Sequence, residues 1–367
     1  MSRTVIGLGD ASAVKRFSAQ LFVDQAREGY WSNRFMAKGR DAMVPVQILT
    51  ELENDAGDTI SYDLFAQLRT KPTYGDNRLK GKEEALRKFN DTVSIDQIRC
   101  GVSGGGRMTR KRTLHDLRMV ARKLMGDWWG RWTDESLFCY AAGARGVNDD
   151  FIEDSDWTGF AGNSLTAPDS THQFYANSIT SKGSVTSSDY VSLALIDKLV
   201  AKAKTLGGGT TGVPKIRPMR INGEDKYVYI MHSFDEYKLR SGTSAGQWVD
   251  IQKAAAAAQG QGNPIYKGGM GEYNGVILHE HQSVIRFNDY GASNNLPASR
   301  NLFLGAQALV MAFGSPGSGL RFDWNEELDD RGNEIVITTA AIAGIKKTRF
   351  NSMDYGLLSA DVYSATV

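Results

Sequence analysis

The chain has 367 residues, of which 41% are hydrophobic and 23% are charged. This composition is typical of a folded protein and excludes an intrinsically disordered one. The 43 Lys and Arg residues nearly balance the 42 Asp and Glu residues and leave a net charge of +1. That balance excludes a protein that binds nucleic acid through bulk positive charge. Cys100 and Cys139 are too few for a disulfide framework and lack the spacing of metal ligands.

No targeting or membrane segment is predicted. The first 20 residues lack the apolar core of a signal peptide. No run of the sequence approaches the ~18 apolar residues that a membrane-spanning helix needs. We therefore expect a soluble intracellular protein with reduced cysteines and no membrane partner.

The first 45 residues mix polar and aromatic side chains without a clear strand or long helical period. Within them, residues 18–35 are predicted to form a short helix. Its expected anchors are Phe17, Leu21, Phe22 and Trp31. We interpret this region as an N-terminal arm that docks its aromatic side chains elsewhere, because terminal segments are ordered only where they are tied down.

Residues 58–106 predict an extended hairpin. Residues 58–68 and 92–100 alternate like strands, and the stretch between them is strongly charged, with turn signals at Lys71-Pro72 and Gly75-Asp76. Long connections inside compact domains are usually functional or disordered. A long connection flanked by its own pair of strands is best explained by a partner surface.

A long amphipathic helix is predicted from about residue 109 to residue 142. Its apolar residues recur in steps of three and four, at Leu114, Leu117, Ala121, Leu124, Trp128 and Trp132. At 1.5 Å per residue such a helix would be about 50 Å long, which exceeds the diameter of a small domain.

Helices and strands are interspersed in the remainder of the chain. A polar, loop-like stretch over 143–187 precedes a second helix, which starts at Ser188 or Asp189 and stops at Gly207. The later predicted elements are a strand at 226–232, an alanine-rich helix at 248–260, a strand at 275–287, a buried strand–helix segment at 300–314 and a long strand at 334–350. Because strands and helices do not alternate regularly, the fold class is α+β.

The sequence contains no established catalytic motif. None of the glycine-rich segments matches a phosphate-binding loop, and no G-x-S-x-G element is present. His279 and His281 would share one face of a strand, about 6–7 Å apart, with His232 as a third candidate metal ligand. This spacing is not that of a common zinc motif. We therefore expect no metal and no cofactor, and keep a metal-dependent enzyme as the alternative.

Basic residues gather on the long predicted helix. The cluster comprises Arg107, Arg110, Lys111, Arg112, Arg118, Arg122, Lys123 and Arg131. Two interpretations are open: a solvated helix face paired with neighbouring acids, or weak contacts with a phosphate backbone that do not read its sequence.

A family resemblance is carried by the segments KYVYIMHSFDEYKLRSG (226–242) and WVDIQKAAAAAQGQGNPIYKGGMGEYNGVILHEHQSV (248–284). The matching features are a strand ending at Met231-His232, a turn at Tyr-Lys-Leu-Arg, a helix marked by Trp248 and residues 251–254, and the segment 263–275. In these features the chain resembles the major capsid proteins of N-four-like tailed bacteriophages.

The resemblance implies the Hong Kong 97-type coat fold. The corresponding division is an N-terminal arm and the start of the peripheral domain at 1–57, an E-loop hairpin at 58–106, a peripheral domain with a spine helix at 107–187, an axial domain with connecting segments at 188–333, and a C-terminal strand returning to the peripheral domain at 334–367. The long hairpin is then explained if it lies over a neighbouring subunit.

The resemblance also implies the function, a major capsid protein that assembles as hexamers and pentamers into an icosahedral shell around double-stranded DNA. Candidate subunit-interface residues are Phe17, Phe22, Tyr30, Trp31, Lys71, Tyr74, Arg78, Lys80, Lys82, Glu83 and Glu84. Candidate contacts with packaged DNA are Arg110, Arg118, Arg122 and Lys123. A nanocompartment shell of the same fold, which encloses cargo instead of a genome, is an alternative.

The expected partners are other copies of the chain, a portal protein, a separate scaffolding protein, a decoration or cement protein and the packaged DNA. The expected location is the virion capsid, after assembly in the host cytoplasm.

Overall fold

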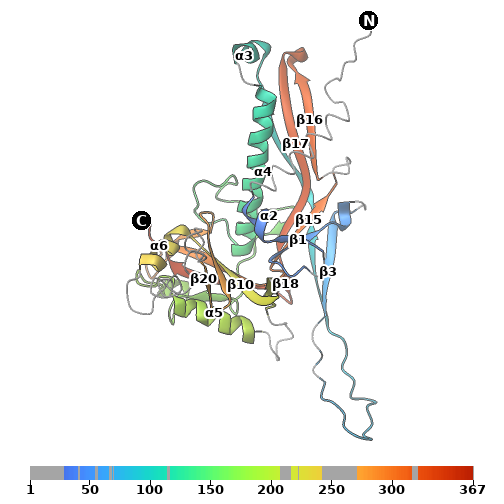
Figure 1. Ribbon diagram of the computed structural model, residues 1–367, viewed down its shortest axis with the longest axis vertical. Coiled ribbons are helices and arrows are strands. Elements are labelled where there is room, and N and C mark those ends of the chain that lie inside the picture. Colours follow the sequence, from blue (N-terminus) through green and yellow to red (C-terminus); the bar gives the residue numbers. More distant parts are fainter. Residues whose placement is uncertain are drawn as a thin grey trace.

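The computed structural model describes residues 29–39, 42–53, 57–65, 68, 70–113, 116–206, 216–221, 223–241, 271–315 and 321–366. In this part of the chain a tall sheet with a long helix rises from a broader body built on a second sheet (Figure 1). A separate two-stranded hairpin extends from the junction and ends in a long loop (Figure 1). No helix among these residues is long and apolar enough to cross a membrane.

The tall sheet is six-stranded and is organised around its longest strand, β17. Its strands are β1 (Met36–Lys38), β2 (Val46–Leu49), β5 (Asp96–Ser103), β15 (Leu309–Gly314), β16 (Phe322–Asp329) and β17 (Glu334–Lys347). The first half of β17 pairs with β16 and its second half with β15, while β5 pairs with its other edge. Strand β17 therefore links β15, with β2 and β1 beyond it, to β16 and β5.

The long predicted helix is two helices, α3 (Arg107–Arg112) and α4 (Leu117–Ala142). The backbone is extended at Thr113, and the Asp116 side chain then caps α4 by accepting a hydrogen bond from the Arg118 amide. Gly143 ends α4 at φ 70°, a left-handed conformation that glycine adopts without strain. The predicted end at residue 142 is confirmed, and the continuous start at 109 is wrong.

The apolar stripe predicted for α4 is only partly buried. Ala121 and Trp132 are buried, but Leu124 is 59% exposed, and Met125 and Trp129 are buried although they were outside the predicted stripe. All residues from Trp132 onward are buried, because this half of the helix packs against strands of both sheets. Periodicity identifies one buried face and cannot detect a helix end that is enclosed on all sides.

The second sheet is eight-stranded and forms the broader body. Its strands are β8 (Gln173–Tyr175), β9 (Met219–Ile221), β10 (Glu224–Met231), β11 (Glu272–Tyr273), β12 (Val276–Glu280), β13 (Arg286–Tyr290), β14 (Leu296–Leu304) and β20 (Leu357–Tyr363). Helix α5 (Leu193–Thr205) buries Leu195, Leu199 and Ala203 against it. Because α5 is capped by Ser192, it starts later than the predicted Ser188 or Asp189.

Several apolar segments form elements other than those predicted. Segment 300–314 is not a strand followed by a helix but parts of two strands, β14 and β15, which belong to different sheets. Segment 275–287 contains two strands, β12 and the start of β13. Short, continuously apolar runs do not distinguish buried strands from buried helices. The expected Tyr-Lys-Leu-Arg turn lies inside helix α6 (Ser233–Ser241), whereas the predicted helix at 248–260 and the markers at 248–254 lie outside the described residues.

A hairpin is present within the predicted segment 58–106, as a ladder between β3 (Thr59–Phe65) and β4 (Lys88–Ser94), but it is shorter than predicted because β5 pairs with β17. The second predicted strand, 92–100, is wrong in its bounds, because it spans the end of β4 and the start of β5. The other predicted strands, 226–232 and 334–350, correspond to β10 and to β17 with β18 (Arg349–Phe350).

The sheets do not follow the division inferred from the sequence. Strands β15 and β16, placed with the axial segments, lie in the tall sheet, and the C-terminal β20 lies in the second sheet between β14 and β8. The remaining short elements are α2 (Tyr30–Arg34), β6 (Gly159–Phe160), β7 (Asn163–Ser164), β19 (Met353–Asp354) and the 3-10 turns Glu51–Glu53, Lys182–Ser184 and Asp330–Gly332.

Candidate functional site

The loop between β3 and β4 exposes apolar side chains. Tyr74 is 75% exposed and Leu86 70%, and Leu68 and Leu79 are also exposed. Figure 1 shows this loop projecting away from both sheets. Apolar side chains gathered on a projecting surface are typical of a contact with another molecule.

All seven charged or aromatic interface candidates predicted for this loop lie within its described part. They are Lys71, Tyr74, Arg78, Lys80, Lys82, Glu83 and Glu84. Two of them also hold the loop's shape: Glu84 Oε2 accepts a hydrogen bond from the Thr70 amide at 2.7 Å, and Glu83 Oε2 accepts one from the Gly81 amide at 2.6 Å. Backbone hydrogen bonds, including that from Gly81, lower the pKa of the Glu83 carboxyl, so it remains charged. The four cations of this group are exposed to solvent.

The aromatic interface candidates near the N-terminus are not at the surface. Trp31 is fully buried, and Tyr30 is buried beside Phe138, with ring centroids 6.0 Å apart. Both belong to the core of their own chain, so their prediction as contacts with a neighbouring subunit is wrong. Phe17 and Phe22 lie outside the described residues.

A buried carboxylate fixes this end of the arm. Asp134 on α4 accepts hydrogen bonds from the Tyr30 amide at 2.6 Å and the Trp31 amide at 3.1 Å. Burial raises the pKa of Asp134 to about 6, although these two hydrogen bonds oppose the shift. The first turn of α2 is thereby attached to the middle of α4.

The three histidines considered as metal ligands pack among aromatic side chains. His281 lies 4.4 Å from the Tyr30 ring and 4.9 Å from the Phe138 ring, and His279 lies 5.1 Å from Phe35. The Nδ1 atoms of His232 and His281 accept hydrogen bonds from the amides of Phe234 and Ser283.

The titration of these histidines fits a structural role. Burial lowers the pKa of His232 and of His281 to about 4, so both rings are neutral at physiological pH. Both also line an open cavity of about 850 Å³. Within the described ranges, no three His, Cys, Asp or Glu side chains gather closely enough to hold a metal ion.

Two of the four candidate DNA-contacting residues, Arg110 and Arg118, line an apolar groove. Arg110 donates a hydrogen bond to the Asn333 carbonyl at 2.9 Å, and Arg118 forms an ion pair with Glu326. Arg122 is half-buried, and Lys123 is exposed. Three of the four are therefore partly occupied within their own subunit or partly buried.

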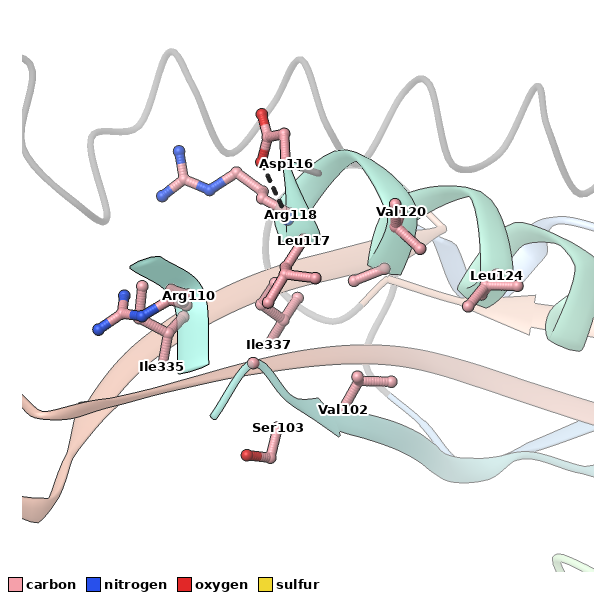
Figure 2. A pocket seen from close by; sticks show the side chains of 12 residues that line it. Val102, Ser103, Arg110, Asp116, Leu117, Arg118, Val120, Leu124, Ile335 and Ile337 are labelled. Carbon is pink, nitrogen blue, oxygen red and sulfur yellow. Dashed lines mark hydrogen bonds between the residues drawn. The ribbon is translucent and has the colours of Figure 1, made fainter. Parts of the chain in front are cut away.

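The groove has a volume of about 400 Å³ and lies between α4, β5 and β17. Its apolar lining comes from Val102, Leu117, Val120, Leu124, Ile335 and Ile337. Figure 2 shows Leu117 directed from α4 toward the strands that carry Val102 and Ile337. The exposed Leu124 thus belongs to an uncovered apolar surface rather than to the core.

Comparison with known proteins decides what this arrangement is. A family described as "Phage capsid protein" matches residues 5–366. The chain belongs to the phage capsid protein family. It is 29% identical to the major capsid protein of Pseudomonas phage KPP25, with 93% of each chain covered.

Solved structures give the same result for this capsid protein. The capsid of Ralstonia phage GP4 is 46% identical, with a TM-score of 0.83 over 100% of this chain and 99% of the other. The capsid of cyanophage Pam1 is 20% identical, with a TM-score of 0.74 over 93% and 94% of the two chains, and supports the fold alone. The Hong Kong 97-type coat fold and the α+β class are confirmed.

The chain is thus a structural protein of a phage capsid and not an enzyme. The metal-dependent enzyme considered from the sequence is therefore wrong as a description of its function. Aromatic packing of His279 and His281 explains their spacing without a metal.

Proposed function

We propose that this capsid protein builds its shell from hexamers and pentamers in which the β3–β4 hairpin of each copy lies on a neighbouring copy. The observation that carries the proposal is the projecting loop with exposed Leu68, Tyr74, Leu79 and Leu86. A lone subunit gains nothing by exposing these side chains, whereas a neighbour can bury them. Each contact can be weak, because every subunit in a closed shell is held by several others.

The domain division is proposed in a form adjusted to the sheets. Helix α4 and the six-stranded sheet would form the peripheral domain, with α4 as the spine helix, and the eight-stranded sheet with α5 and α6 would form the axial domain. Residues 58–94 would form the E-loop, because β5 beyond them pairs with β17.

The remaining partners are proposed from the family resemblance. A portal protein, a separate scaffolding protein and a decoration or cement protein would complete the particle, which would assemble in the host cytoplasm. Contact with packaged DNA would be weak and indifferent to sequence, since the net charge is only +1. Lys123 is the most available candidate cation, because Arg110 and Arg118 already have partners in their own subunit.

The decisive experiment removes the loop. Replacing residues 70–87 by a short Gly-Ser linker leaves both sheets and the β3–β4 ladder in place. We expect a folded subunit with an unchanged circular dichroism spectrum that forms no closed shells, as judged by light scattering and electron microscopy. A matched variant, Glu327→Gln, changes an exposed side chain on β16 and should assemble normally. Normal shells from the loop deletion would overturn the proposal.

A further inference from the structure

The hairpin is attached to the rest of the subunit over a small area. Ile60 and Val93 pack in one small apolar cluster with Leu49, and Leu64 packs in another with Phe350 and Tyr355. The opposite faces of β3 and β4 are largely exposed, as their alternating burial shows. At the base of the hairpin the Asn163 side chain also accepts a hydrogen bond from the Ser94 amide and donates one to the Ser94 carbonyl. The direction of the hairpin therefore depends on contacts near its base.

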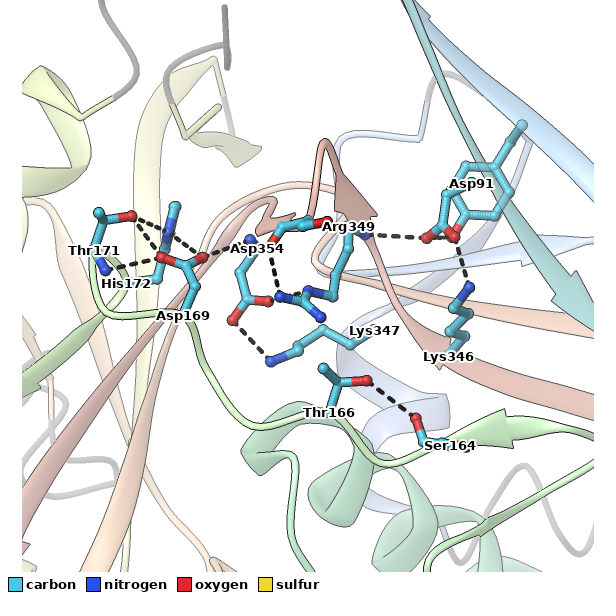
Figure 3. A network of polar contacts seen from close by, with 12 residues as sticks. Asp91, Ser164, Thr166, Asp169, Thr171, His172, Lys346, Lys347, Arg349 and Asp354 are labelled. Carbon is cyan, nitrogen blue, oxygen red and sulfur yellow. Dashed lines mark hydrogen bonds and ion pairs between the residues drawn. The ribbon is translucent and has the colours of Figure 1, made fainter. Parts of the chain in front are cut away.

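Asp91 is the polar centre of this attachment and is flanked by the two clusters. Its side chain is 11% exposed. Oδ1 accepts hydrogen bonds from Lys346 Nζ at 2.6 Å and from the Thr92 amide at 2.8 Å. Oδ2 accepts from Tyr62 Oη at 2.7 Å and from the Arg349 amide at 3.1 Å. One carboxylate thus joins β3, β4, β17 and β18 (Figure 3).

Only an ionised carboxylate satisfies this set of partners. All four groups around Asp91 are donors, and both oxygens accept two bonds each. Burial and the neighbouring Asp91 raise the pKa of Tyr62 well above its ordinary value, so its hydroxyl keeps the proton that it donates. An amide in place of the carboxylate would set its NH₂ group against Lys346 Nζ and the Thr92 amide in one orientation and against the Arg349 amide in the other.

The contacts continue from Asp91 into the second sheet. Lys347 follows Lys346 in the chain, and its Nζ lies 2.8 Å from the fully buried carboxylate of Asp354. Asp354 also pairs with Arg349 Nε at 3.0 Å. The Asp354 amide donates to Asp169 Oδ2 at 2.8 Å. Residue 169 lies just before β8, so a chain of polar contacts runs from the hairpin to the body (Figure 3).

We propose that Asp91 is the positioning residue of the hairpin: its hydrogen bonds from Lys346 and from the Arg349 amide set the angle at which the loop leaves the subunit. The inference rests on the proposed function, in which that loop must meet a neighbouring copy. It goes beyond that function because it assigns the direction of the loop to Asp91, a residue outside the loop that makes the proposed contact.

The geometry amplifies any change at this residue. Asp91 pairs with Tyr62 in the middle of the β3–β4 ladder, so the last part of the ladder, about 10 Å long, and the whole loop lie beyond it. A small rotation of the hairpin about Asp91 would therefore displace the loop by more than it displaces the base of the hairpin.

The test uses the full chain before assembly, with spin labels at Asp76→Cys on the loop and Asn325→Cys on β16 in a Cys100→Ser background. Asp91→Asn should broaden or shift the distance distribution between the labels. It should also speed hydrogen exchange in β3 and β4 at least ~10-fold while leaving β14 and β20 unchanged. Tyr62→Phe should have the same effect more weakly, since it removes one donor.

The matched control is Tyr290→Phe, which removes a tyrosine donor from another buried aspartate, Asp361, in the second sheet. It should leave the distance distribution unchanged. An unaltered distribution in Asp91→Asn, or one that broadens equally in the control, would overturn the proposal.

Assembly separates this inference from the proposed function. If Asp91→Asn changes the distances and yields few or misshapen shells, both stand. If the distances change and shells form normally, the positioning role stands and the need for the hairpin in assembly fails. If the distances do not change, the positioning role fails whatever the shells show.

Discussion

Two aspartates that each accept four hydrogen bonds lie in contrasting parts of the molecule. Asp361 in the second sheet accepts from Arg300 Nε at 2.8 Å, Arg300 Nη2 at 3.0 Å, Tyr290 Oη at 2.7 Å and Gln173 Nε2 at 2.6 Å. All of these donors come from strands of one sheet. Asp91 at the hairpin also has four donors, but two of them come from outside the hairpin.

The surroundings of the two residues differ accordingly. Asp361 is fully buried, and the strand that carries it lies between two others, so ladder hydrogen bonds and apolar packing hold its neighbours in any case. Asp91 lies where the hairpin joins the rest of the subunit, beside two small apolar clusters and the hydrogen bonds of Asn163 with the Ser94 backbone. A carboxylate that accepts four hydrogen bonds stabilises the second sheet at Asp361 and, as proposed above, sets the direction of the hairpin at Asp91.

The largest expected effect comes from breaking the pair in the sheet. Arg300→Met leaves the Asp361 charge buried without its cation, so we expect the free energy of unfolding to fall by about 3–5 kcal/mol. Chemical denaturation followed by fluorescence measures the loss. Lys182→Met, which breaks the exposed pair with Asp289, is the control and should change stability by less than about 1 kcal/mol. Equal losses of stability in the two variants would show that the buried pair contributes no more to stability than the exposed pair.

A smaller and more local effect is expected at the hairpin. Lys346→Met removes one charged donor from Asp91, and such hydrogen bonds contribute about 1.5–3 kcal/mol. Because the pair is partly exposed, we expect the lower end of that range. Hydrogen exchange should show the loss in β3 and β4 and not in β14. Uniform acceleration across both sheets would show that the pair stabilises the whole fold rather than the hairpin.

A third test concerns a buried carboxylate that has no hydrogen-bonded cation. Burial raises the pKa of Asp235 to about 6, above the ordinary 3.8. The native state therefore binds the extra proton, and stability is lost as the pH rises from about 4 through 6, by on the order of 1–3 kcal/mol. Asp235→Asn should be less sensitive to pH over this interval in denaturation at several pH values. If the stability of Asp235→Asn and that of the unaltered chain depended on pH in the same way, Asp235 would not be the group responsible for the loss of stability.

The smallest effect on stability is expected at the exposed loop. Leu86→Ser and Leu79→Ser should change the free energy of unfolding by no more than about 0.5 kcal/mol, because both side chains are more than half exposed. Both should reduce the yield of closed shells, as measured by sedimentation. A marked loss of stability would show that the loop is part of the subunit's own core.

Some features of the fold followed from local patterns. Glycine and charge between two alternating segments predicted the hairpin, and a helical repeat predicted that α4 would end at Ala142. The apolar segment 300–314 was misassigned, because whether such a run pairs in a sheet depends on strands elsewhere in the chain. Tyr30 and Trp31 were expected at an interface, since aromatic residues alone do not reveal whether their partner is in the same chain.

The residues of the candidate site were likewise only partly predictable from the sequence. Lys71, Arg78 and Lys80 could be located from the sequence, because a charged loop between strands has to be exposed. Asp91 could not, since nothing near it in sequence indicates that Lys346 and the amide of Arg349 lie within hydrogen-bonding distance.

The sequence by itself determined the α+β class, the existence of the hairpin and, through the segments 226–242 and 248–284, the family. The class and the hairpin depend on local periodicity and turn chemistry, which act over a few residues. The family depends on the resemblance that those two segments carry. Only the tertiary structure decided which apolar residues stay exposed, which carboxylates are buried and which donors converge on Asp91. Burial and hydrogen-bond partners depend on residues distant in the chain, so they are settled only when those residues pack together.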